Sequence, residues 1–335
     1  MLHFLLCSMM EKGLLPKLSI GLALVLLASC ADITSIQGAA GEEQANTTSV
    51  AAPPTPAPVV ATVVPYATRE VTIRPGEVQF LKFQRPAAFP EGELWCGDQK
   101  FPVQEQGTEL ISFISESYFS ELERRDCSWK TASLVYKIAN FSIQKRTFPQ
   151  EFLKVNPRTI ELSGPDFERV KSEQQVLGVI YANSSKVLFF EMPFKRPLKS
   201  RITSYYGIQR LYNKVKKGQH LGIDFRARVG VPVPASNRGK VVLAQDLFFT
   251  GMTVIIDHGL GIFSIYGHLS SILVNVGDIV VPTTILGNSG NTGRASGPHL
   301  HWGVKVGQHL IDGLQLIEMT EKEFAHGRQN LSSNI

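Results

Sequence analysis

Two histidines stand one residue apart in GPHLHWG, residues 297–303, as His299 and His301. In a β-strand the side chains of residues i and i+2 point to the same face. Two imidazoles on one face can divide a task, because one can bind a metal ion while the other moves protons. An isolated H-x-H pair is also compatible with two surface histidines at a strand end, so other residues must decide.

A second pair, His220 and Asp224, lies four residues apart in GQHLGIDF. Even spacing keeps both side chains on one face of a strand, and Gly222 between them permits a bend. This glycine and the β-type neighbours disfavour a helix. Nitrogen and carboxylate ligands together suit Zn²⁺. Alone, the H-x-x-x-D spacing also occurs by chance.

Two more histidines follow, His258 in IIDHGLG and His268 in IYGHLS. Five of the eight histidines of the chain therefore fall within residues 220–301. Such clustering favours a metal site more strongly than any one motif does.

The elements that must hold these residues are short apolar runs separated by glycine-rich turns. They read GKVVLAQ, MTVIIDHG, IFSIYGHLS, VNVGDIVV and HLHWGVKV. Runs of this length, with turn signals about every ten residues, predict an antiparallel all-β domain. We place this domain at residues 198–315 and treat residues 316–335 as a C-terminal tail.

The preceding segment, residues 69–197, predicts a smaller β-rich accessory domain without a catalytic cluster. We expect a hairpin in EVTIRPGEVQFLKF, a strand in KVLFFEMPF and a short helix at residues 110–123.

Several motifs together resemble the M23 peptidases, the lysostaphin-like or LytM-type zinc endopeptidases. They are SYYGIQR, HLGID, IDHGLGIFSIYGHLS, VNVGDIV and LGNSGNTGRASGPHLHWGV, in the family's order and spacing. The resemblance covers roughly residues 198–313, about a third of the chain. It implies an antiparallel lysostaphin-like fold and hydrolysis of peptide cross-links in bacterial peptidoglycan.

The resemblance also assigns roles residue by residue. His220, Asp224 and His301 match the three ligands of one zinc ion per chain, with a fourth position for water. His299 matches the catalytic histidine, and His268 matches the second catalytic histidine. His258 matches a turn residue that we interpret as structural.

Two further features concern the rim of this site. The basic loop RLYNKVKKGQ, residues 210–219, would border the substrate groove and could meet carboxylate-bearing peptides, although a merely solvated loop is equally compatible. Tyr205, Tyr206 and Tyr212 are each candidates for an oxyanion donor, and the sequence does not choose among them.

Two alternatives belong to other functional classes. A LytM-type module that regulates cell-wall amidases without cutting would have the same fold, but such modules typically lack the zinc ligands. Two histidines and a carboxylate could also form the facial triad of an iron oxygenase. Metal content and oxygen dependence would separate these readings.

The N-terminus indicates export. Lys12 and Lys17 precede the apolar run LSIGLALVLLASC, which is short for a membrane span. Leu27-Ala28-Ser29-Cys30 resembles a lipobox and implies a lipoprotein signal peptide at residues 1–29, with acylation of Cys30. An ordinary signal peptide is the alternative. Residues 30–68, rich in Ala, Thr and Pro, predict a linker. We expect an exported protein that is lipid-anchored at a bacterial membrane and faces the periplasm or cell wall, at the outer membrane in a Gram-negative cell.

Charge and cysteine usage agree with this compartment. The net charge of +5 is mild and has no long basic run, so we expect no nucleic-acid partner. Export leaves Cys96 and Cys127 in an oxidising setting, which favours a disulfide between them over two buried free thiols.

Overall fold

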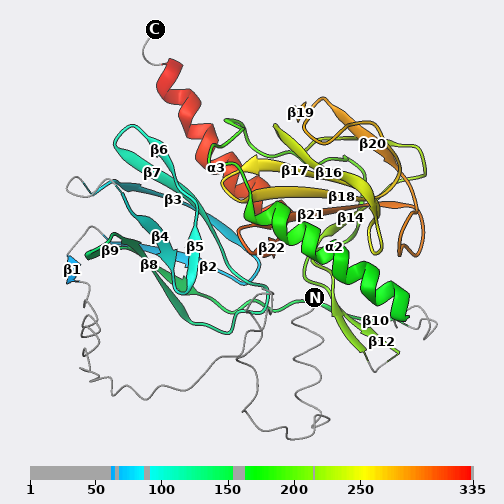
Figure 1. Ribbon diagram of the computed structural model, residues 1–335, viewed down its shortest axis with the longest axis horizontal. Coiled ribbons are helices and arrows are strands. Elements are labelled where there is room, and N and C mark those ends of the chain that lie inside the picture. Colours follow the sequence, from blue (N-terminus) through cyan, green and yellow to red (C-terminus); the bar gives the residue numbers. More distant parts are fainter. Residues whose placement is uncertain (1–61, 65–67, 87–90, 154–162, 214–215, 333–335) are drawn as a thin grey trace, which may run out of the picture. The chain divides into compact units, whose positions relative to one another are not determined.

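The computed structural model describes residues 62–64, 68–86, 91–153, 163–213 and 216–332 (Figure 1). The expected signal peptide and Cys30, and nearly all of the expected linker, lie outside these residues. Within the described part of the chain, no helix combines the length and apolarity that crossing a membrane requires.

The largest sheet has ten strands and follows the order β11-β14-β21-β18-β17-β16-β19. In addition, β20 pairs with β18, β15 pairs with β20, and β22 pairs with β21. Every pairing in it is antiparallel. Its strands are β11 (Ile202–Ser204), β14 (Ile223–Arg226), β15 (Pro232–Pro234), β16 (Gly239–Leu247), β17 (Gly251–Gly259), β18 (Ile262–Ile272), β19 (Ile279–Val280), β20 (Ile285–Ser289), β21 (His299–Val306) and β22 (His309–Ile311).

The N-terminal region contains two smaller sheets. One has the order β1-β9-β8-β4-β5, with β2 also paired to β9, and the other has the order β3-β7-β6. Strands β1 and β2 run parallel to β9. The bounds are β1 (Thr62–Val64), β2 (Arg69–Ile73), β3 (Val78–Gln84), β4 (Glu93–Cys96), β5 (Gln99–Phe101), β6 (Gln104–Gln106), β7 (Glu109–Ser115), β8 (Arg124–Lys130) and β9 (Leu134–Ile143).

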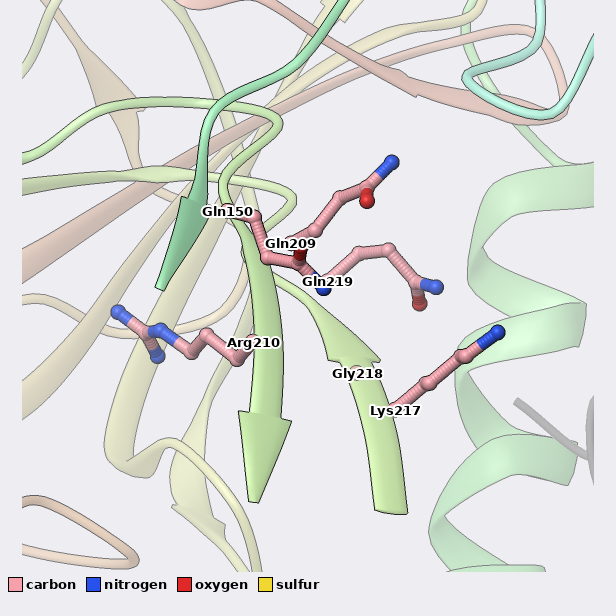
Figure 2. Close-up of a pocket in the computed structure, with 6 residues that line it drawn as sticks. All are labelled: Gln150, Gln209, Arg210, Lys217, Gly218 and Gln219. Atoms are coloured by element: carbon pink, nitrogen blue, oxygen red, sulfur yellow. The ribbon is translucent and has the colours of Figure 1, made fainter. Parts of the chain in front are cut away.

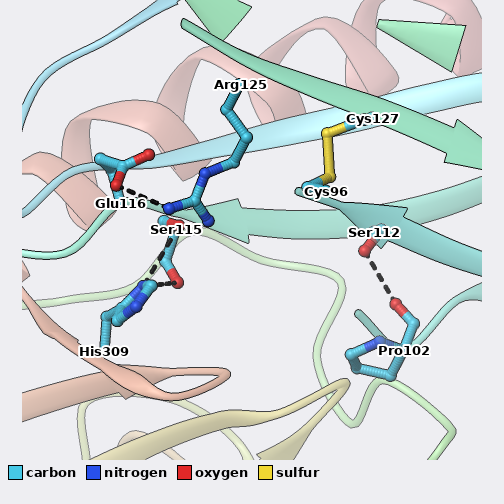
Figure 3. Close-up of a disulfide and its surroundings, with 8 residues drawn as sticks. All are labelled: Cys96, Pro102, Ser112, Ser115, Glu116, Arg125, Cys127 and His309. Atoms are coloured by element: carbon cyan, nitrogen blue, oxygen red, sulfur yellow. Dashed lines mark hydrogen bonds and ion pairs between the residues drawn. A yellow bond between two sulfur atoms is a disulfide. The ribbon is translucent and has the colours of Figure 1, made fainter. Parts of the chain in front are cut away.

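The expected disulfide is confirmed: Cys96 on β4 is bonded to Cys127 on β8 (Figure 3). The two cysteines face each other in the register of these neighbouring strands, and both are fully buried. They belong to a hydrophobic core that the two N-terminal sheets form among themselves, around Leu94, Phe141 and Trp129.

A second core joins the N-terminal sheets to the large sheet. Val78, Ile111 and Phe113 pack in one cluster with Phe225 and Trp302 of the large sheet. Polar contacts cross the same boundary. The Ser115 hydroxyl donates to the Val306 carbonyl at 2.8 Å, and Arg146 pairs with Asp312 at 2.7 Å. The region that contains the large sheet therefore packs directly against the N-terminal sheets.

A third small sheet lies beside the large one and combines both regions. Its order is β10 (Gln150–Leu153), β12 (Gln209–Tyr212), β13 (Lys216–Gln219). Strand β10 runs parallel to β12, and β13 runs antiparallel to it. The basic loop of the sequence analysis is thus largely a β-ribbon.

Two helices complete the described fold, α2 (Gly164–Ala182) and α3 (Gly313–Ser332). Ser163 caps α2 through a capping box with Asp166, and Pro165 follows in the first turn. Helix α3 begins at Gly313, inside the predicted peptidase segment, and its residues Leu316 and Met319 are buried in the second core.

The all-β fold class is confirmed, but three local predictions are wrong. Residues 109–115 form strand β7 rather than a helix. Almost every one of these side chains is buried, so the sequence lacks the alternation of polar and apolar residues that would indicate a strand. Strands β2 and β3 pair with β9 and β7 instead of with each other. Residues 186–194 pack as an irregular segment without strand pairing.

Candidate metal centre

Strand register brings the motif residues to one place. Asp224 on β14 stands directly opposite His301 on β21, and His301 also pairs with Gly267 on β18. His299 and His301 are the first and third residues of β21, so the predicted common face of the H-x-H pair is present. His220 and Asp224 do not share a strand, because the chain leaves β13, passes Gly222 and enters β14.

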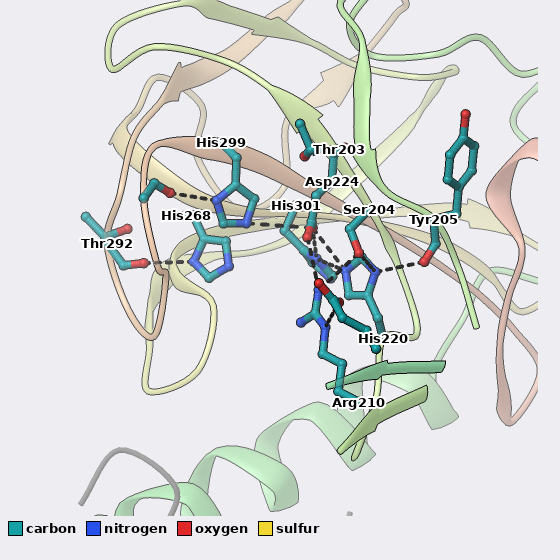
Figure 4. Close-up of polar contacts among 12 residues, drawn as sticks. Thr203, Ser204, Tyr205, Arg210, His220, Asp224, His268, Thr292, His299 and His301 are labelled. Carbon is teal, nitrogen blue, oxygen red and sulfur yellow. Dashed lines mark hydrogen bonds and ion pairs between the residues drawn. The ribbon is translucent and has the colours of Figure 1, made fainter. Parts of the chain in front are cut away.

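Three side chains that could hold a metal ion converge there: His220, Asp224 and His301 (Figure 4). Asp224 Oδ1 lies 3.0 Å from His220 Nε2 and 2.9 Å from His301 Nδ1. The two histidine nitrogens are 3.3 Å apart. His220 and Asp224 are buried, and His301 is partly buried.

The charges in this cluster are coupled. Burial alone would raise the pKa of the Asp224 carboxyl, but the neighbouring His220 and His301 imidazoles lower it far below its usual range. Burial lowers the pKa of His301, although the nearby Asp224 carboxylate opposes this shift. Asp224 is therefore an anion at neutral pH, the form in which a carboxylate binds a metal.

A backbone carbonyl fixes the tautomer of His220. Its Nδ1 lies 3.0 Å from the carbonyl oxygen of Tyr205. A carbonyl oxygen only accepts, so Nδ1 must carry the proton and donate it. The lone pair is then on Nε2, the nitrogen that faces Asp224 and His301.

His299 and His268 are held in the same way. His299 Nδ1 donates to the Gly297 carbonyl at 2.7 Å, and His268 Nδ1 donates to the Thr292 carbonyl at 2.8 Å. His299 Nε2 lies 3.7 Å from Asp224 Oδ1, and the rings of His268 and His299 are 4.7 Å apart between centroids. Both histidines thus lie beside the cluster. In the neutral form of each ring the proton is on Nδ1, and Nε2 carries a lone pair.

The backbone of His268 has an unusual conformation, with φ of +60°. This value is uncommon for a non-glycine residue and costs free energy. It coincides with an irregular register where β18 changes partner residues. Burial, with the nearby His301, lowers the pKa of His268 to about 4, so its ring is neutral at pH 7.

Arg210 and Ser204 form a shell behind the ligands that the sequence analysis did not identify. Arg210 Nη2 donates to Ser204 Oγ at 3.0 Å and lies 3.7 Å from Asp224 Oδ2. Ser204 Oγ is in turn 3.0 Å from His220 Nδ1. One oxygen of Asp224 therefore faces the histidines while the other faces a guanidinium.

His258 and the tyrosines have other surroundings. His258 is fully buried, with Nδ1 against the Arg238 carbonyl and Nε2 against Ser264 Oγ, which agrees with a structural role. The Tyr206 hydroxyl donates to the Leu310 carbonyl. Tyr205 contacts the site through its carbonyl, while its exposed side chain points away from His220 (Figure 4).

Part of this chain is similar to known peptidases. The sequence pattern of Peptidase family M23 matches residues 202–313. The peptidoglycan DD-endopeptidase ShyA of Vibrio cholerae is 42% identical over 118 residues, which are 35% of this chain and 27% of ShyA. An uncharacterized metalloprotease of Buchnera aphidicola is 34% identical over 134 residues, 40% of this chain and 35% of that protein.

A solved structure is similar over a longer stretch. A protein of Pseudomonas aeruginosa described as a peptidase M23 superposes with a TM-score of 0.57 at 25% sequence identity, over 73% of this chain and 95% of its own. By contrast, the alignments cover only about a quarter to a third of the length of the two curated relatives. The family pattern at residues 202–313 includes His220, Asp224, His268, His299 and His301.

Proposed function

We propose that the Peptidase family M23 domain at residues 202–313 makes this chain a zinc metalloendopeptidase that hydrolyses peptide cross-links of bacterial peptidoglycan. One observation carries the proposal: His220, Asp224 and His301 present three ligand atoms to one point, with His299 and His268 beside them.

The donor set fits zinc. Bonds of about 2.0–2.1 Å in a tetrahedral arrangement require ligand atoms about 3.3 Å apart. The three distances among His220 Nε2, Asp224 Oδ1 and His301 Nδ1 are 2.9, 3.0 and 3.3 Å. Two neutral imidazoles and one carboxylate also leave a net positive charge on a bound dication, as catalytic zinc sites do.

A bound zinc ion supplies Lewis-acid polarisation of the scissile carbonyl and a water whose pKa is lowered towards neutrality. The proton transfers belong to His299. Its Nδ1–H is committed to the Gly297 carbonyl, so Nε2 is free to accept a proton from the attacking water. The same nitrogen then returns the proton to the leaving amine.

His268 has a different capacity. It is neutral at pH 7 and donates from Nδ1 to the Thr292 carbonyl, so its Nε2 can only accept. We therefore assign His268 to orient the attacking water beside His299, and to stabilise negative charge only if it gains a proton during the reaction.

The substrate class rests on the relatives. ShyA is named as a peptidoglycan DD-endopeptidase and is 42% identical to this chain over 118 residues, while the family pattern at residues 202–313 spans the candidate ligands. A peptide cross-link is the bond class that this chemistry and this similarity jointly support. We further propose that the protein is exported and anchored through Cys30, which mass spectrometry of the mature N-terminus would test.

The regulatory alternative predicts a degenerate site. In this chain all three candidate ligands and both flanking histidines are present and gathered. The donor set also resembles an iron facial triad in composition. For that alternative, activity would require iron and oxygen.

Digestion of purified sacculi tests the proposal. Protein from residue 31 onward is compared with His299→Ala, and zinc is quantified in both. We expect about one zinc per chain in each protein and loss of cross-linked muropeptides only with the first. Intact cross-links in both digests, with no zinc bound, would instead support the regulatory module.

A further inference from the structure

The small sheet β10-β12-β13 has two chemically distinct faces. Its register pairs Glu151 with Arg210 and Arg210 with Gly218 in one row. Arg210 points from this row towards Ser204 and Asp224, so this face belongs to the metal centre. Side chains of the neighbouring rows point to the opposite face.

That opposite face carries a row of three glutamines. The register aligns Gln150 on β10 with Gln209 on β12, and Gln209 with Gln219 on β13. In Figure 2 the side chains of Gln209 and Gln219 extend to one side of the ribbon, together with Lys217, while Arg210 extends to the other. The next row on the glutamine face aligns Phe152, Leu211 and Lys217.

A hollow of about 200 Å³ lies along this row, and it is not the metal site. Its lining residues are Gln150, Gln209, Arg210, Lys217, Gly218 and Gln219. The side chain of Gln209 forms a hydrogen bond with the Tyr118 hydroxyl. Within the described residues, no hydrogen bond or ion pair engages the side chains of Gln150, Gln219 or Lys217. Phe152 is 64% exposed at the end of the same face.

We propose that this glutamine face binds an N-acetylated sugar of the glycan strand, as an exosite for the substrate of the proposed function. Each primary amide offers two donors and one acceptor, which match hydroxyl and acetamido groups. The exposed Phe152 ring supplies an apolar surface against which a sugar ring can pack.

The charge of the face favours a sugar over a peptide stem. Stem peptides carry free carboxylates, and their recognition calls for cationic pairs. Here three neutral amides accompany the single cation of Lys217. Arg210 is directed to the metal side, and Lys216 stands in the row next to that of Lys217, where adjacent rows alternate between the faces of a sheet.

The placement also suits a branched polymer. The glutamine face and the metal centre lie on opposite faces of a single sheet, and β13 is one of its two edges. A glycan on one face can send its attached peptide around the β13 edge to the other. Binding the sugar therefore raises the local concentration of the peptide at the metal centre.

Calorimetric titration of the purified whole chain in detergent with tetra-N-acetylchitotetraose, a peptide-free probe, tests this. We expect saturable binding that weakens at least tenfold in Gln150→Ala and in Lys217→Ala. Gln106→Ala, an exposed glutamine on β6, is the matched control and should bind as the parent does. Cellotetraose, which lacks acetamido groups, should bind at least tenfold more weakly.

The outcomes separate this proposal from the peptidase proposal. Cleavage of soluble cross-linked peptide dimers without chitotetraose binding would overturn the exosite and leave the peptidase intact. Chitotetraose binding without cleavage would overturn the peptidase proposal and leave the sugar-binding face intact. Undiminished binding in both glutamine-face variants, or competition by a sugar-free stem peptide for the same site, would also overturn the exosite.

Discussion

Gly222 and His301 approach so closely that a β-carbon on Gly222 would stand 2.3 Å from His301 Cε1 and 2.6 Å from its Nε2. No side chain fits between them. The glycine of the H-x-x-x-D motif therefore does more than permit a bend, since its missing side chain is the space that the His301 imidazole occupies.

Replacing Gly222 by alanine should therefore displace His301 and weaken zinc binding by about 10–100-fold, the range seen when ligand orientation is disturbed. Competition with a zinc chelator measures this affinity. Gly178→Ala is the control, because that glycine lies in helix α2 with open space around its Cα. Parental zinc affinity in Gly222→Ala would show that the contact relaxes without cost.

Ser204→Ala should lower zinc affinity by roughly tenfold or more, because it removes the oxygen that links Arg210 to His220 Nδ1. Metal affinity and thermal midpoint should be measured together, so that loss of folding is recognised. Ser133→Ala, in an exposed turn, supplies the comparison. If the two serine variants bound zinc equally, the shell behind His220 would have no part in holding the ligand.

His268→Ala should retain zinc but lower kcat by about 10²-fold, because the attacking water loses the acceptor that orients it. The expectation follows from its position beside His299 and its distance of 5.9 Å, between ring centroids, from His301. Metal analysis with kinetics on a soluble peptide dimer checks it. Loss of zinc in parallel with activity would make His268 a ligand or a structural support instead.

His309 predicts a pH dependence of stability. Burial, and then the charge of Arg125, lower the pKa of His309 to about 4, against 6.5 for an unperturbed histidine. The unfolded chain therefore takes up a proton that the folded chain refuses. The contribution of His309 to the free energy of unfolding is therefore fully present above pH 6.5 and is lost as the pH falls towards 4.

His309→Gln should reduce the loss of unfolding free energy between pH 7.5 and 4.5 by about 2–3 kcal/mol. Urea titrations at the two pH values measure it. Lys199→Gln, an exposed site, should leave the parental pH dependence unchanged. A His309→Gln chain as acid-sensitive as the parent would place the acid-sensitive groups elsewhere, for example at the buried His258.

The sequence predicted the antiparallel domain and the cluster of motif residues, because spacing and residue type encode both. It did not predict what fixes their orientation. The acceptors of His220, His268 and His299 are backbone carbonyls of Tyr205, Thr292 and Gly297, and any residue type supplies a carbonyl. Between His220 and Asp224 the chain passes from the small sheet of β13 to the large sheet of β14, and no local sequence pattern predicts this change of sheet.

The accessory region shows a different limit. Strand β7 is buried on both faces, so its sequence lacks the alternation that identifies a half-exposed strand. Helix α2 was recognisable, since Ser163, Pro165 and Asp166 together form a standard helix start. The strand-like pattern of the surrounding segment masks this signal.

The most direct test of the account is anomalous diffraction at the zinc edge from crystals of the purified protein. We predict one peak per chain, about 2.0–2.2 Å from His220 Nε2, Asp224 Oδ1 and His301 Nδ1. His299 should lie outside the coordination sphere, with its Nδ1 still donating to Gly297. A peak bonded to His299, or no peak from a protein that cuts peptidoglycan, would contradict the assignment of ligand and base.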